Sequence, residues 1–134
     1  MSDFNKGIIE KFRANGGVVG GYFEGMNLLL VHTTGAKSGL ERINPVAQIM
    51  DGNRYVIIAS KGGAPTNPDW YYNIKANPEV TIEVGTQKYP ALAAITEEPE
   101  RSELYEKMAA QYAGFKDYKE KTKRVIPVVT LTRQ

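Results

Sequence analysis

Residues 79–95 read EVTIEVGTQKYPALAAI, and this stretch decides the fold class. Val80, Ile82 and Val84 alternate with polar residues, which is the period-two pattern of a strand with one buried and one solvated face. Gly85 and the residue after it interrupt the alternation and predict a tight turn. Residues 87–95 then supply the partner strand, so the stretch predicts an antiparallel hairpin.

A second hairpin is indicated by Asp51-Gly52-Asn53, because these residues accept the positive φ of a tight turn. The segments 42–50 and 55–60 are its predicted strands. Two further strands are predicted at 27–34, which begins with an apolar run, and at 125–132. About six strands in meander-like order, with helices inserted late, indicate a mostly β, small antiparallel barrel rather than a parallel α/β sheet.

Three helices are expected beside these strands. Asn67 is the predicted N-cap of a short helix from Pro68 to Ala76, and a longer helix follows Thr96 with an apolar stripe. The other spans Asp3 to Ala14 and either docks on the core or lies on a membrane surface. We therefore expect a helix and glycine-rich link over residues 1–26, and a barrel domain over 27–134. The apolar stripe of the longer helix comprises Leu104, Tyr105, Met108, Ala109 and Tyr112.

Composition excludes several classes of function. The 134 residues contain no cysteine, which rules out disulfides, thiolate nucleophiles and cysteine-based metal sites. A net charge of +2 does not suggest a nucleic-acid binder. No apolar run is long enough to span a bilayer, and the N-terminus lacks the apolar core of a signal peptide. We expect a cytoplasmic protein.

Familiar catalytic motifs are missing. The stretch from Thr34 to Gly39 is not a Walker A loop, and no G-x-G-x-x-G opens a helix. The only histidine, His32, lies in an apolar strand, where we expect a structural, hydrogen-bonded role; a histidine-dependent triad would have to use it. Carboxylates are dispersed, so no metal site is expected. The chain is then either a binding module or a protein that takes its chemistry from a cofactor.

Two groups of residues fit a bound cofactor. Lys37, Arg42 and Lys61 lie at predicted strand ends, where a barrel gathers them into an anion site; the alternative is that they are ordinary solvated cations. In the 70–73 segment WYYN, an aromatic side chain can stack on a flat ring while Asn73 bonds its edge. The alternative for Trp70 is packing in the core.

Taken together, the motifs resemble the deazaflavin-dependent nitroreductase family of F420H2-dependent reductases. The resemblance covers about three quarters of the chain, from residue 31 to residue 129. The matching stretches are TTGAKSG at 33–39, RINP at 42–45, ASKGGA at 59–64, NPDWYYNIKANP at 67–78, FKDY at 115–118 and RVIP at 124–127.

This resemblance implies a split β-barrel of the flavin-reductase type that binds the deazaflavin coenzyme F420. It implies that Lys37, Arg42 and Lys61 hold the phosphate and acidic tail of the coenzyme. Members of the family act on quinones and nitroaromatics, and some contact the membrane through the N-terminal helix. For this chain the resemblance implies such contact at the inner face of the cell membrane. The ring is expected against Pro45, Ser60, Trp70 and Asn73, and the predicted cofactor site is completed by Ser38, Asn44, Val46, Ala59 and Gly62.

Three departures from the family bear on substrate choice: Ala36 replaces a frequent second basic residue, Ala47 replaces an aromatic near the ring, and Phe115 occupies an acceptor-side position that can be tyrosine. The missing hydroxyl at Phe115 favours quinones over nitroimidazoles.

The implied reaction is a two-electron hydride transfer from the reduced deazaflavin, with proximity and orientation supplied by the protein. The proton comes from Tyr112, Tyr118, Ser60 or solvent. Two alternatives remain open: an oxidoreductase that binds flavin mononucleotide (FMN) on the same barrel, and a non-catalytic carrier of F420 or a flat lipid-like ligand. The acceptor and the oligomeric state are not determined by the sequence.

Overall fold

Residues 79–95 form the hairpin that their alternation predicts. β5 (Glu79–Val84) pairs antiparallel with β6 (Gln87–Ile95), and Gly85 takes a φ of 59° in the turn between them. The computed structural model describes residues 3–19, 26–59, 67–112, 115 and 125–134. Val80 and Ile82 are buried while Glu79 is exposed, so the two faces of β5 differ as expected.

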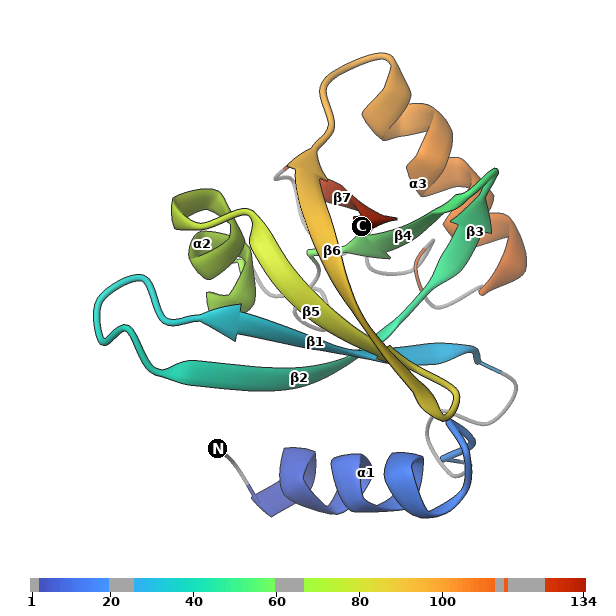
Figure 1. Cartoon of the computed structure of the whole chain (residues 1–134). Helices are drawn as coiled ribbons and strands as arrows, with labels where there is room; N and C mark the ends of the chain where they lie inside the picture. The colour runs from blue at the N-terminus through green and yellow to red at the C-terminus, as the bar shows by residue number, and fades with distance from the viewer. Residues whose placement is uncertain (1–2, 20–25, 60–66, 113–114, 116–124) are drawn as a thin grey trace.

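The described residues form one seven-stranded sheet, and all of its strand pairs are antiparallel (Figure 1). The spatial order is β2-β1-β5-β6-β7-β4-β3. The mostly β, antiparallel prediction is confirmed, but the meander-like order is wrong where β1 pairs with β5 and β4 with β7. The other strands are β1 (Leu28–Thr34), β2 (Glu41–Ala47), β3 (Ile49–Asp51), β4 (Arg54–Ile58) and β7 (Val128–Arg133).

The predicted 42–50 strand is split at Gln48, which is why seven strands form instead of about six. The backbone N–H of Gln48 donates to the Asn27 carbonyl at 2.9 Å, and the Gln48 carbonyl accepts from the Tyr112 hydroxyl at 3.3 Å. Neither the backbone N–H nor the backbone carbonyl of Gln48 therefore bonds to a neighbouring strand. Because only this residue separates β2 from β3, which lie at opposite edges, the two edges meet here and the sheet curls.

In the described part of the chain, three helices pack on this sheet (Figure 1). α1 (Asp3–Ala14) has the predicted bounds, and α3 (Glu100–Gln111) ends at Tyr112, its C-cap. α2 (Asp69–Ala76) has Pro68 as its N-cap, so the prediction that Asn67 caps this helix is wrong by one residue. The Asn67 amide instead donates to the Tyr72 hydroxyl at 3.3 Å. β7 also begins later than predicted, because Pro127 has no N–H to give to a ladder.

The helices cover both faces of the sheet. On one face, Trp70 and Ile74 of α2 pack with Leu29, Ile57 and other strand residues. On the opposite face, α3 covers the β4 side of the sheet, while α1 covers the β1 side through Ile9 and Phe12. This places α2 alone beside the end of the β1–β2 hairpin, where the polar loop of residues 35–40 begins (Figure 1).

The apolar side of α1 is buried against the sheet. Ile8, Ile9 and Phe12 are buried, and Phe12 is fully enclosed. Their packing against β1 agrees with the interpretation of α1 as a helix docked on the core. Within the described ranges, no helix is long and apolar enough to cross a bilayer.

Candidate functional site

The loop between β1 and β2 is a closed, hydrogen-bonded turn. Gly35 donates to the Leu40 carbonyl at 2.7 Å, and Gly39 donates to the Gly35 carbonyl at 2.9 Å. A Cβ at Gly35 would lie 2.5 Å from the Ser38 hydroxyl oxygen, and Gly39 has a φ of 71°. Glycine is therefore favoured at both positions, and the turn presents Lys37 and Ser38 to solvent.

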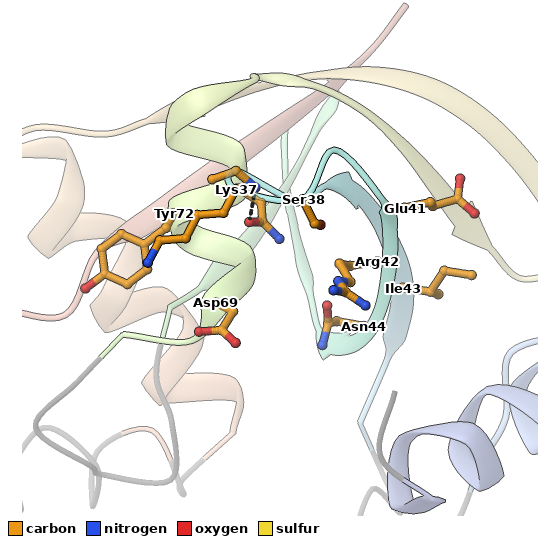
Figure 2. Close-up of a pocket in the computed structure, with 11 residues that line it drawn as sticks. Lys37, Ser38, Glu41, Arg42, Ile43, Asn44, Asp69 and Tyr72 are labelled. Atoms are coloured by element: carbon orange, nitrogen blue, oxygen red, sulfur yellow. Dashed lines mark hydrogen bonds between the residues drawn. The ribbon is translucent and has the colours of Figure 1, made fainter.

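A cavity of about 850 Å³ lies beside this loop, between β2 and α2 (Figure 2). A volume of this size is in the range of small-molecule and cofactor sites. Polar and charged residues from three elements meet at its wall. The lining residues are Gly35, Ala36, Lys37, Ser38, Glu41, Arg42, Ile43, Asn44, Asp69, Tyr72 and Asn73.

Strand alternation decides which residues of β2 face α2. Figure 2 shows Arg42 and Asn44 on one side of the strand and Ile43 on the other. Pro45 pairs with Leu30, on the face that α1 covers, and Val46 packs against the core under α2. Of the predicted trio Asn44, Pro45 and Val46, the structure brings only Asn44 to the cavity.

Among the described residues, two cations and two carboxylates line the cavity. Lys37 and Arg42 have no ion-pair partner among the residues that the structure describes, and both are exposed. Glu41 and Asp69 are the carboxylates. Since neither cation is neutralised by a neighbour, both remain available to an anionic group on a ligand.

Asn73 lines the cavity from α2 with its amide already engaged. Its Oδ1 accepts from the Ala36 backbone N–H at 2.9 Å, and its Nδ2 donates to the Thr33 hydroxyl at 3.1 Å. The expected bond to the edge of a flat ring is therefore not its main use here. The amide joins α2 to the base of the 35–40 loop.

The aromatic residue of α2 that reaches the cavity is Tyr72 and not Trp70. Trp70 is 5% exposed and packs in the core with Ile74, four residues away on the same side of the helix. Tyr72 is 48% exposed and lines the cavity with Asp69. Asp69 was not predicted, and Tyr72 was not singled out within the WYYN segment, although the Trp70–Ile74 spacing indicates that these two residues lie off the core-facing side.

Tyr112 and Phe115, the predicted proton donor and acceptor contact that the structure describes, do not line this cavity. Tyr112 accepts from the Asn27 N–H at 2.9 Å and donates to the Gln48 carbonyl, so its hydroxyl holds the backbone. Phe115 is buried beside Tyr112 under α3, and Ala59 is fully buried in the core under α2. Four predicted residues lie outside the described residues: Ser60, Lys61, Gly62 and Tyr118.

His32 has the expected structural role. It is 5% exposed, and its Nε2 lies 2.5 Å from a carboxylate oxygen of Glu83, which Arg13 of α1 also binds. The hydrogen bond from Arg13, followed by that from His32, lowers the pKa of Glu83 to about 2 against the effect of burial. These three residues fasten α1 to the sheet. Within the described part of the chain, no group of three acidic or histidine residues is arranged to hold a metal ion.

Comparison with known proteins identifies the family. A family model described as F420H(2)-dependent quinone reductase matches residues 6–133. An F420H(2)-dependent quinone reductase of Mycobacterium tuberculosis (strain H37Rv) is 41% identical over 109 residues, which cover 79% of this chain and 73% of that protein.

The chain is also similar to solved structures, one of which is described as an F420-dependent reductase. A structure described as F420-H2 dependent reductase FDR-A has 38% identity and a TM-score of 0.71, and the match covers 78% of this chain and 92% of that one. A structure described as a domain-swapped dimer has 31% identity and a TM-score of 0.74, with 96% of each chain covered. As its motifs indicated, the chain belongs to the F420H2-dependent quinone reductase family.

Proposed function

We propose that this protein reduces a quinone with the reduced deazaflavin coenzyme F420H2 and that the cavity between β2 and α2 holds the coenzyme. The observation that carries the proposal is the closed 35–40 loop, which presents Lys37 at a cavity of about 850 Å³ that Arg42 also lines. Neither cation has an ion-pair partner among the described residues. Family membership supports F420 over FMN as the cofactor.

The residues at the cavity fit the anionic part of this coenzyme. Lys37 and Arg42 supply charge, and the Ser38 hydroxyl adds a polar contact at the same wall. Lys61, together with Ser60 and Gly62, follows β4 in the sequence and is proposed to extend this site. Asn44 of β2 and Tyr72 of α2 also line the cavity, from its two sides (Figure 2).

When bound, reduced F420 supplies a hydride to the acceptor. The protein's part is to hold the anionic end at Lys37 and Arg42 and to orient the flat portion between Tyr72 of α2 and Asn44 of β2. Ser60, Tyr118 or solvent is the proposed proton source. Tyr112 is not included, because its hydroxyl is committed to the backbone of Asn27 and Gln48.

Quinones are the acceptor class that the family indicates. We extend the proposal to nitroaromatic compounds as secondary acceptors on the motif resemblance alone. Membrane contact through α1 is not included, because Ile9 and Phe12 are buried against the sheet.

The test begins with purified protein titrated separately with F420 and with FMN, following the fluorescence of each ring. F420H2 consumption is then measured with menadione as the acceptor. We expect F420 binding and menadione-dependent oxidation of F420H2. Binding of FMN without binding of F420 would overturn the proposal, and binding of F420 without turnover of any quinone would make the protein a carrier.

A further inference from the structure

A buried side-chain pair lies beneath the 35–40 loop, which carries Lys37. Thr33, at the end of β1, is 2% exposed, and Asn73 of α2 is 7% exposed. The Asn73 Nδ2 donates to the Thr33 hydroxyl at 3.1 Å, and the Asn73 Oδ1 accepts from the Ala36 N–H at 2.9 Å. Figure 2 shows this last bond between the loop and α2.

This pair lies at the base of both cations. Ala36 directly precedes Lys37, so a bond to its N–H fixes the backbone from which the lysine side chain extends. Thr33 pairs across the strands with Arg42, so the same pair also lies at the base of the arginine. Residues 36–40 are all exposed, and the hydrogen bond that Ala36 donates to Asn73 therefore links this loop to the rest of the protein where packing does not.

We propose that Thr33 and Asn73 are positioning residues that hold the 35–40 loop in the geometry that binds the anionic end of the cofactor. Thr33 does not line the cavity, and it acts only through the amide of Asn73. Fixing a loop in its bound geometry raises affinity because less ordering remains to be done on binding. This inference rests on the proposed function.

The direct test is Thr33→Val, which removes the hydroxyl at nearly constant volume, with Thr33→Ser as the matched control that keeps it. We expect the valine variant to bind F420 about 3- to 10-fold more weakly, which is the scale of one hydrogen bond, and the serine variant to bind like wild type. A deazaflavin that lacks the phosphate and acidic tail should bind the wild type and the valine variant equally.

A double-mutant cycle separates positioning from direct contact. If Asn73 acts through the loop, Asn73→Ala should weaken F420 binding strongly in the wild-type background and little in Lys37→Ala. Losses that simply add in the double variant would show that Asn73 and Lys37 act independently and would overturn the proposal. Equal weakening of the tail-less deazaflavin would overturn it as well.

Amide hydrogen exchange tests whether Thr33 and Asn73 hold the 35–40 loop, without any cofactor. The Ala36 N–H should exchange faster in Thr33→Val than in wild type or Thr33→Ser, while the Ile82 N–H in the middle of β5 should be unchanged. Unchanged exchange at Ala36 would overturn the proposal. Absence of F420 binding in the wild type would instead refute the proposed function, and the exchange result would still decide whether Thr33 holds the loop.

Discussion

Lys37 and Arg42 are the two residues whose charge the proposed function uses most directly. We predict that Lys37→Ala and Arg42→Ala each weaken F420 binding about 10- to 100-fold, as expected for loss of a charge-assisted hydrogen bond. Saturated turnover should change little, because the anionic end is remote from the reacting ring. Lys88→Ala, an exposed lysine outside the cavity, is the control. Unchanged affinity in both variants would mean that these cations are ordinary solvated residues.

Glu83 predicts a specific loss of stability in acid. Because its folded pKa is lowered from 4.5 to about 2, its stabilisation is complete above pH 4.5 and disappears as the pH falls toward 2. We expect a contribution of about 1–2 kcal/mol, reduced by solvent screening because the Arg13 side chain is half exposed.

Urea denaturation of wild type and Glu83→Gln, repeated from pH 7 to pH 3, measures this contribution. The free-energy difference between the two proteins should shrink as the pH falls through this window. A difference that stays constant with pH would show that the ion pair with Arg13 does not stabilise the fold.

Part of the cavity was predictable from single residues. Lys37, Ser38, Arg42, Asn44 and Asn73 were predicted from motif positions and line the cavity. The predicted contacts at Pro45, Trp70 and Phe115 depend on which way a side chain faces, and tertiary packing buries the last two. The Thr33–Asn73 pair was beyond prediction, because it joins residues 40 positions apart.

Among the elements, local signals worked where one residue type dictates the backbone. The turns at Gly52 and Gly85 have the positive φ that their sequences indicate, and α1 has its predicted bounds. The break at Gln48 carries no comparable signal. It arises because Asn27 and Tyr112, both distant in sequence, take the hydrogen bonds of Gln48 that a continuous strand would use.

Two glycines give opposite predictions at this scale. Gly7 is inside α1 with open space around its Cβ position, so Gly7→Ala should raise the free energy of unfolding by about 0.5–1 kcal/mol. Gly52 also has open space, but its φ is 63°, so Gly52→Ala should lower that free energy by about 1 kcal/mol. Urea denaturation followed by Trp70 fluorescence measures both. The same sign for both would contradict the assignment of backbone strain to Gly52.

At the scale of the whole molecule, one sheet joins cores on both faces, and this predicts cooperative unfolding. Met108 of α3 is fully buried on the face of the sheet opposite Trp70, and Met108→Ala should lower the free energy of unfolding by about 2–5 kcal/mol. Because both cores share the strands of the sheet, Trp70 fluorescence and far-ultraviolet circular dichroism should give one common midpoint in wild type and in the variant. A fluorescence midpoint that stays at the wild-type value would mean that the two faces unfold separately.

The single-residue connection at Gln48 also determines where the chain tolerates change. Extra residues in the exposed turn at Gly52 and Asn53 lengthen one hairpin and leave both sheet edges in place. Extra residues at Gln48 would allow β2 and β3 to separate. The position of β2 matters because it contains Arg42 and Asn44, which line the cavity. The turn at Gly52 and Asn53 is therefore a suitable insertion site for a tag or a fused domain. An insertion at Gln48 would instead break the connection between the two sheet edges and would abolish ligand binding without changing any residue that touches the ligand.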